Sequence, residues 1–368
     1  MQLSKRIQKI EESGIRKIFA LAAERGNEFV NLSIGQPHFP APAAVKQAAI
    51  AAVEANRSTY TPTAGLPTLR ELIAGKLRNK NNIIAMAEQT LVTSGASASL
   101  LLAFSAIFDE GDEIILPDPY FVLYYELLQF LGVKIKLLDT YPTFQIDASK
   151  IAPLITDKTK AILVNSPNNP TGAVYTREVL EQIARVAKAH DLIVISDEIY
   201  EPFDYEHQFV SIASMYQNTV TINGFSKSHS ITGWRLGYAH GPQEIISAMN
   251  RLQQYSFVCG PSIAQYAVMD AFDASIKDGV ALYQKNRDYL FQELSQYYEF
   301  NKPAGAFYAF IKAPGGRVDF IDELIAHKLL AVPGSVFSSR SDYFRISFAV
   351  EPSILEQGVA ILKSIAKT

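Results

Sequence analysis

The chain has 368 residues, of which 48% are hydrophobic and 19% are charged. That length exceeds what one hydrophobic core usually organises, so we expect one large and one smaller domain. A formal net charge of −3 argues against a nucleic-acid or anionic-membrane partner. The single cysteine, Cys259, excludes an internal disulfide framework and favours the reducing cytoplasm as the setting.

The first forty residues carry two different patterns. Leu3, Ile7 and Ile10 recur at helical spacing and predict an arm that packs on another surface. The segment 29–34 is β-like and is expected to join the smaller domain. The N-terminal segment is charged throughout and lacks the apolar core of a secretion signal. We therefore expect residues 1–40 to form an arm and part of the smaller domain.

Strand-like and helix-like segments alternate between about residues 90 and 255. The expected strands are 90–94, 113–117, 133–139, 161–166, 192–198 and 219–222. Helices are expected at 98–108, from residue 121, and from an N-cap at Thr176 to His190. The apolar run 98–108 is too short to span a bilayer and suits a buried helix. Nearly continuous Val, Ile and Leu runs predict a mostly parallel sheet that is buried on both faces, in an α/β layer architecture.

The pattern changes after Pro261. It is mostly helical as far as residue 296, and then short strands are expected at 306–312 and 343–349, separated by a helix at 319–330. These segments predict a small α+β domain. The expected division of the chain is an arm with part of the small domain at 1–40, a large domain at 41–285 and the rest of the small domain at 286–368.

Residues with useful chemistry follow five of the predicted strands. In open α/β sheets, ligands collect beyond the carboxyl ends of the strands. The first strand is followed by a helix start with free backbone N–H groups, and the later ones by an aromatic ring, an amide, a carboxylate with a phenol, and a lysine with an arginine. In chain order these residues are Ala96, Ser97, Phe121, Asn169, Asp197, Tyr200, Ser226, Lys227 and Arg235. Each one alone has an ordinary structural explanation, such as a turn or a cap. Their occurrence at the ends of strands of one sheet favours a shared site.

Lys227 lies in the segment GFSKSHSITGWRLG, 224–237, just past a predicted strand. A lysine whose pKa is lowered by its surroundings can form an imine with an aldehyde, and a nearby arginine can bind a phosphate with two hydrogen bonds. An aldehyde that carries a phosphate is pyridoxal phosphate. Asp197 is the candidate to keep the pyridine nitrogen protonated, while Tyr200 and Asn169 are candidates to contact the phenolate oxygen. Lys227 would then serve as general acid and base.

These motifs together resemble the class I/II aminotransferases, which are pyridoxal-phosphate enzymes of fold type I. The resemblance covers nearly the whole chain. It rests on the lysine segment and on five others in the family's order: NLSIGQPHF (31–39), YTPTAGLPTLR (60–70), SPNNPTG (166–172), SDEIY (196–200) and YFRISFA (343–349). It implies a mostly parallel, seven-stranded type of sheet in a large cofactor-binding domain, with a smaller α+β domain built from both termini.

The resemblance also implies roles for individual residues. Lys227 would be the Schiff-base lysine, and Arg345 would grip the substrate α-carboxylate. Gly35 would lie where the N-terminal segment closes over the substrate. Tyr60 would reach the phosphate of a neighbouring subunit, which implies a homodimer with shared active sites. Asp197 would be the partner of the pyridine nitrogen, and Tyr200 and Asn169 would contact the phenolate oxygen. The implied phosphate contacts are Ala96, Ser97, Ser226 and Arg235. Phe121 would stack on the cofactor ring.

The chain departs from the family pattern at three places. Gly224 stands where many members have a phosphate-binding serine, which places more of that load on Ser226 and Arg235. His38 replaces a common aspartate, and we interpret it as a solvated loop residue. The segment 338–340, SSR, occupies a place where a glycine is frequent and is expected to alter the loop that lines the pocket. His229, two residues from Lys227, is interpreted as structural.

The predicted activity is transfer of an amino group from an L-amino acid to a 2-oxo acid by a ping-pong mechanism. Glutamate and 2-oxoglutarate are the expected shared pair, with aspartate and aromatic amino acids as candidate partners. Two alternatives stay open: a pyridoxal-phosphate lyase on the same scaffold, either a β-eliminating C–S lyase or one making cyclopropane amino acids, and a non-catalytic sensory module. No glycine-rich dinucleotide or NTP motif is present, and the six histidines have no ligand spacing, so no metal site is expected.

Overall fold

The computed structural model describes the chain except for residues 1–2, 11–13, 15–17, 19–23, 25–27 and 367–368. Near the N-terminus, Ile7–Lys9 forms a short 3-10 turn. The side chains of Leu3 and Ile7 are 61% and 46% exposed, and the arm that packs on another surface stays a prediction. Ile10 does face the rest of the molecule, because it lines the cavity described below.

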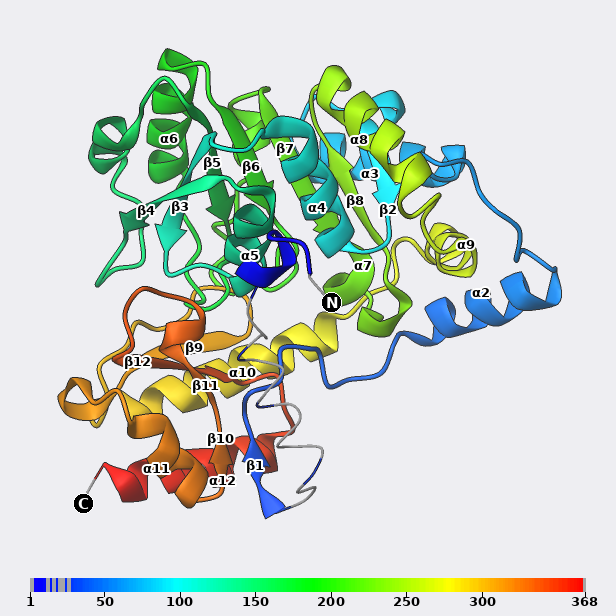
Figure 1. Cartoon of the computed structure of the whole chain (residues 1–368). Coiled ribbons are helices and arrows are strands. Elements are labelled where there is room, and N and C mark those ends of the chain that lie inside the picture. The colour runs from blue at the N-terminus through cyan, green and yellow to red at the C-terminus, as the bar shows by residue number, and fades with distance from the viewer. Residues whose placement is uncertain (1–2, 11–13, 15–17, 19–23, 25–27, 367–368) are drawn as a thin grey trace.

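A seven-stranded sheet organises the larger part of the molecule (Figure 1). Its order is β2-β8-β7-β6-β5-β3-β4, and β8 is antiparallel to both of its neighbours while the other pairs are parallel. The strands are β2 (Thr90–Thr93), β3 (Glu113–Asp118), β4 (Lys134–Asp139), β5 (Thr159–Asn165), β6 (Ile193–Asp197), β7 (Thr219–Gly224) and β8 (Gly237–His240). The expected mostly parallel sheet is therefore confirmed.

Helices cover both faces of this sheet because its strands carry apolar side chains on both faces. In β5, Ala161 and Leu163 belong to one hydrophobic cluster, while Ile162 and Val164 belong to another on the opposite face. Helices α4 (Ala96–Ile107), α5 (Val122–Leu131) and α8 (Gln243–Tyr255) pack into the first cluster. The other face is covered by α2 (Ala43–Glu54), α3 (Pro67–Asn81), α6 (Arg177–Ala189) and α9 (Ser262–Asp270).

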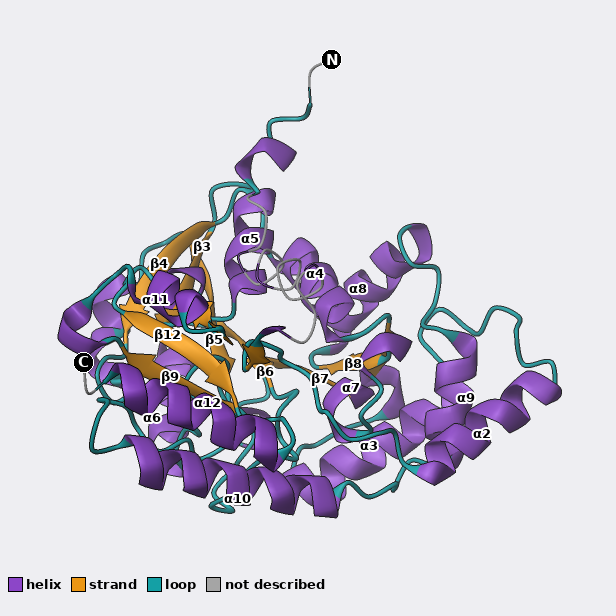
Figure 2. Ribbon diagram, turned by 90° about the horizontal axis from the view of Figure 1, so that it is seen from below, coloured by secondary structure: helices purple, strands orange, loops and turns teal. Residues whose placement is uncertain are grey.

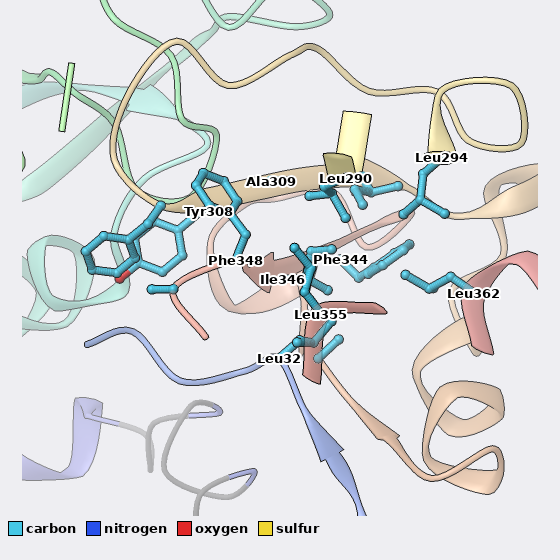
Figure 3. Packing of buried hydrophobic residues seen from close by; sticks show 14 of the residues in the cluster. Leu32, Leu290, Leu294, Tyr308, Ala309, Phe344, Ile346, Phe348, Leu355 and Leu362 are labelled. Carbon is cyan, nitrogen blue, oxygen red and sulfur yellow. The ribbon is translucent and has the colours of Figure 1, made fainter. Parts of the chain in front are cut away.

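A second core lies below the large sheet in Figure 1 and combines both ends of the chain. It contains the antiparallel sheet β11-β12-β9 and the parallel pair β1-β10, in which Val30 pairs with Leu329. Figure 3 shows Leu32 from the N-terminal segment packed near Ile346 and Leu355, and in Figure 2 helices α10 and α12 run next to each other. These elements are β1 (Val30–Asn31), β9 (Tyr308–Lys312), β10 (Leu329–Leu330), β11 (Val332–Pro333), β12 (Tyr343–Ser347), α10 (Lys277–Leu294), α11 (Phe320–Ala326) and α12 (Pro352–Ile365).

Several predicted boundaries differ from those of the structure. The helix expected at 319–330 ends at Ala326, and the apolar residues after it form β10 instead. Helix α6 matches its prediction, and the Thr176 hydroxyl accepts a hydrogen bond from the backbone N–H of Val179 at 3.4 Å. Helix α10 runs unbroken through residue 285, the expected end of the large domain, and Tyr283 and Leu290 both pack in the second core. The division into domains at 40 and 285 stays a prediction.

Candidate active site

A cavity of about 740 Å³ lies at the carboxyl ends of the parallel strands. Nearly all of the residues singled out in the sequence line it: Gly35, Ala96, Ser97, Phe121, Asn169, Asp197, Tyr200, Ser226, Lys227, Arg235 and Arg345. Tyr60 is not among the lining residues, and its side chain is 84% exposed. The site predicted from separate strand ends is therefore one cavity in this chain.

The register of the sheet explains why the segments after three strands meet. Asn165 at the end of β5 pairs with Asp197 at the end of β6, and Asp197 pairs with Ile222 in β7. The Asn165 side chain then ties two of these ends together. Its Nδ2 donates to the Asp197 carbonyl at 3.0 Å, and its Oδ1 accepts from the backbone N–H of Asn169 at 3.0 Å. Asn169 and Asp197 consequently enter the cavity from adjacent strands.

Lys227 lies in α7 (Phe225–Ser228), the single helical turn that follows β7. Its Nζ donates to the Gly35 carbonyl oxygen at 2.7 Å, so the lysine already contacts the N-terminal segment. Burial, together with the positive charges of Arg345 and Arg235, lowers the pKa of Lys227 to about 7, against the opposing effect of Asp197. A large fraction of this amine is therefore uncharged near neutral pH and available as a nucleophile or base.

Asp197 is a buried carboxylate that faces the same cavity. It is 3% exposed, and its Oδ2 accepts a hydrogen bond from the Tyr124 hydroxyl at 2.7 Å. Burial raises its pKa to about 6, against the opposing effect of the Tyr124 hydrogen bond. The carboxyl group is thus still mostly ionised at neutral pH. The contact of the Tyr124 hydroxyl with Asp197 was not predicted from the sequence.

Arg345 projects from β12 and is 1% exposed. Its Nη1 donates to Asn169 Oδ1 at 2.9 Å, and its Nη2 donates to the Ser33 carbonyl at 2.9 Å. The Nε atom has no hydrogen-bond acceptor among the described residues. A buried unpaired donor is costly unless a ligand completes it. Arg345 also lines the cavity, where its guanidinium group can offer N–H donors to an anionic group.

Tyrosine hydroxyls form a second polar contact beside Arg345. The Tyr200 and Tyr308 hydroxyl oxygens are 2.9 Å apart, and burial raises the pKa of Tyr200 well above its ordinary value. The guanidinium carbon of Arg345 lies 4.3 Å from the centre of the Tyr308 ring. Tyr200 is thus a neutral hydrogen-bond donor in a site that holds cations.

Another group of cavity residues is suited to an anion. Helix α4 begins at Ala96, where the first backbone N–H groups of a helix have no partner within the helix. Gly95 has φ +84, and a Cβ there would lie 2.5 Å from Arg235 Nη2, so only glycine lets the arginine approach this helix start. Ser97 and Ser226 line the same cavity. These donors fit a phosphate dianion, as Lys227 fits an aldehyde and Asp197 a protonated pyridine nitrogen.

The two histidines near the site have structural contacts. His229 does not line the cavity; its ring packs edge-to-face against Phe225 at 5.3 Å, as a structural residue would. His38 was wrongly interpreted as a solvated loop residue. Its Nδ1 lies 2.9 Å from the Tyr283 hydroxyl and its Nε2 lies 3.3 Å from Glu351, so the ring ties the N-terminal loop to α10 and to the start of α12. A third departure, the segment 338–340, contacts Asp118 at the end of β3 through two serine hydroxyls.

No group of three or more His, Cys, Asp and Glu side chains among the described residues is arranged to hold a metal ion. None of the described helices combines the length and apolar character needed to cross a bilayer.

The family model for aminotransferase class I and II matches residues 27–362. A probable aspartate aminotransferase of Methanocaldococcus jannaschii is 37% identical, over 99% of both chains. Aromatic-amino-acid aminotransferase 2 of Thermococcus litoralis is 34% identical, over 100% of this chain and 99% of its own. The solved structure of Thermus thermophilus aspartate aminotransferase with maleate superposes with a TM-score of 0.96 at 36% identity, covering 99% of this chain and 100% of that one. The chain therefore belongs to the class I and II aminotransferases, which depend on pyridoxal phosphate.

Proposed function

We propose that this aminotransferase moves an amino group from an L-amino acid to a 2-oxo acid by a ping-pong mechanism, with Lys227 as the covalent anchor and the proton carrier. The observation that carries the proposal is the meeting of Lys227, Asp197 and Arg345 in one cavity. A nucleophilic amine, a carboxylate for a ring nitrogen and a cation for a substrate carboxylate are the groups that this chemistry requires.

Pyridoxal phosphate bound in this cavity would supply an aldehyde carbon and an electron-accepting ring. Asp197 would keep a proton on the pyridine nitrogen, which its ionised state near neutral pH supports. Tyr200 and Asn169 would donate hydrogen bonds to the phenolate oxygen. The ring of Phe121 would cover one face. Phosphate contacts would come from the backbone N–H of Ala96, the hydroxyls of Ser97 and Ser226, and Arg235.

The lysine amine is suited to both halves of the proton transfer. Lys227 would accept the proton from the substrate Cα and return it to the cofactor carbon. General acid–base catalysis is most efficient when the pKa of the group lies near the working pH, and the pKa of Lys227 is about 7. Arg345 would bind the substrate α-carboxylate with guanidinium N–H groups and hold the Cα–H bond toward Lys227. Gly35, whose carbonyl accepts from Lys227, would border the substrate.

For the substrates, we propose glutamate and 2-oxoglutarate as one pair, with aspartate or aromatic amino acids as the other. The names of the relatives, which include aspartate and aromatic-amino-acid aminotransferases, support both choices. Among the described residues that line the cavity, the cations are Lys227, Arg235 and Arg345. Since each has a role above, recognition of a side-chain carboxylate would need a further group.

A panel of amino donors assayed against 2-oxoglutarate tests the proposed activity. We expect turnover with aspartate, with phenylalanine or tyrosine, or with both classes. Activity with none of the common amino acids would contradict the proposal. Release of pyruvate and ammonia from cystathionine, without any oxo-acid acceptor, would instead favour a C–S lyase.

We also propose a homodimer in which Tyr60 completes the neighbouring active site. Tyr60 and Tyr255 have side chains that are 84% and 89% exposed, and large exposed aromatics are common where a second subunit binds. A cytoplasmic setting likewise stays a prediction, supported by the single cysteine.

Hybrid dimers provide a direct test of the shared site. Tyr60→Phe should weaken cofactor binding by about fivefold, since it removes one hydrogen bond to a charged phosphate. In a hybrid of this variant with Lys227→Ala, one active site receives both native residues, so half of the wild-type activity should return at limiting cofactor. No recovery on mixing would contradict the exchange of Tyr60 between subunits.

A further inference from the structure

The segment 338–340 makes a contact with β3 that the proposed mechanism does not use. Asp118 ends β3 and is 4% exposed. Its Oδ1 accepts a hydrogen bond from Ser338 Oγ at 2.5 Å. Its Oδ2 accepts from the backbone N–H of Ser339 at 3.2 Å and from Ser339 Oγ at 2.5 Å. One carboxylate of the large sheet thus holds two consecutive serines of the C-terminal part.

The end of β3 also holds Phe337, the residue before Ser338. Two residues after Asp118, the backbone N–H of Tyr120 donates to the Phe337 carbonyl at 2.7 Å. Phe337 is fully buried, and its ring centre lies 4.6 Å from the guanidinium carbon of Arg345. The cation is attracted to the face of this ring as it is to the ring of Tyr308. The position of Phe337 therefore helps to set where the Arg345 donors point.

We propose that Asp118 is a positioning residue for the substrate carboxylate. Through Ser338 and Ser339 it fixes Phe337, and through Phe337 it holds Arg345 in the geometry that receives the carboxylate. Without the carboxylate, the Ser339 N–H and two hydroxyl groups lose their acceptor, and the loop can shift toward other partners. This inference rests on the proposed role of Arg345.

Tyr141 also holds the segment 338–340 near β3, independently of Asp118. The Tyr141 hydroxyl donates to Ser338 Oγ at 2.8 Å, and the Arg340 guanidinium carbon lies 4.0 Å from the centre of the Tyr141 ring. These contacts keep the loop near β3 when Asp118 is changed. The expected result is a small displacement of Phe337 and not the loss of the whole loop.

The test compares Asp118→Ala with Ser339→Ala and Ser339→Thr. For Asp118→Ala, KM for the amino acid and for the 2-oxo acid should each rise about tenfold, as expected when hydrogen bonds to a charged group are lost. The value of kcat should stay within about twofold, because the loss is in binding a group common to both substrates. Ser339→Ala should show the same change more weakly, and Ser339→Thr, which keeps the hydroxyl, should restore KM.

Two binding measurements separate a positioning role from a general structural one. The affinity of the apoprotein for pyridoxal phosphate, followed by absorbance, should not change in Asp118→Ala. Inhibition by an unreactive carboxylate, either maleate or 3-phenylpropionate, should weaken in parallel with KM. Lys312→Ala is the matched control; it breaks the Lys312–Glu299 pair at 3.0 Å in the same small sheet and should leave all values unchanged.

Unchanged KM values in both Asp118→Ala and Ser339→Ala would overturn the inference, as would a loss of cofactor affinity with KM unchanged. If Asp118→Ala does not fold, Ser339→Ala decides the question, because its exposed side chain is removed without leaving a buried cavity. A wild-type protein that transaminates no donor would contradict the proposed function itself. That result can be distinguished from the two outcomes that overturn the role of Asp118.

Discussion

Replacement of Lys227 with alanine should lower the rate of transamination by at least about a thousandfold, because general acid–base and nucleophilic catalysis are lost together. The measurement is the half-reaction with a single amino donor, followed by the absorbance of the bound cofactor. Lys227→Arg should be equally inactive, since arginine keeps the positive charge but does not release its proton near neutral pH. A wild-type rate in either variant would show that the mechanism is wrong.

The same variant also separates chemistry from binding. Lys227→Ala removes the hydrogen bond to the Gly35 carbonyl but none of the phosphate donors around Ala96 and Arg235. We therefore expect the melting temperature to stay near that of the wild type and much of the phosphate affinity to remain. Added methylamine should restore part of the rate, because a small free amine can enter the space that the lysine side chain leaves.

The strand order and the site were predictable to different extents. Strands such as β5 were recognised because both of their faces are apolar, which gives continuous Val, Ile and Leu runs. Strand β8, Gly237–His240, was missed because it has four residues and begins with glycine, a pattern that is common in turns. The end of α11 was missed for another reason: Lys328 has φ 63, and no glycine marks this left-handed turn in the sequence.

The site residues were predictable because they follow strand ends, and parallel strands bring their carboxyl ends to one edge. Contacts between distant segments were not. The Lys227–Gly35 hydrogen bond joins residues 192 positions apart, and the contact of Asp118 with Ser338 joins residues 220 positions apart. No local pattern encodes such pairs, since they depend on how the two cores pack against each other. For this reason the sequence supplied the identity of Arg345 but not the residues that hold it.

The largely buried ion pair of Lys76 and Glu201 should have the largest effect on stability. Lys76 in α3 pairs with Glu201, and their side chains are 19% and 16% exposed. Glu201 also accepts hydrogen bonds from Asn81 Nδ2 at 3.0 Å and Asn223 Nδ2 at 2.9 Å. Although burial opposes both charges, Tyr238 and Glu201 raise the pKa of Lys76, while Lys76 lowers that of Glu201. Both groups are therefore charged at neutral pH.

Lys76→Met should lower the free energy of unfolding by about 3–5 kcal/mol, because it leaves a buried carboxylate without its cation. The measurement is urea unfolding at pH 7, between the ordinary pKa values of 4.5 and 10.5, where the stabilising effect of both shifts is fully present. Since the pKa of Glu201 is depressed, its share is lost as the pH falls below this window. Because the pKa of Lys76 is raised, the stabilisation that it contributes is lost as the pH rises above 10.5.

Lys80→Met is the matched control for this prediction. Lys80 lies in the same helix and pairs with Asp273 at 3.7 Å, but its side chain is 65% exposed, so its loss should cost less than about 1 kcal/mol. Equal effects in the two variants would contradict a special role for the buried pair. A double variant, Lys76→Met with Glu201→Leu, should recover part of the stability because no uncompensated charge remains. It should not recover full activity: Asn223, which loses its acceptor on Glu201, accepts through Oδ1 from the Gly224 N–H at 2.7 Å, directly before the turn that carries Lys227.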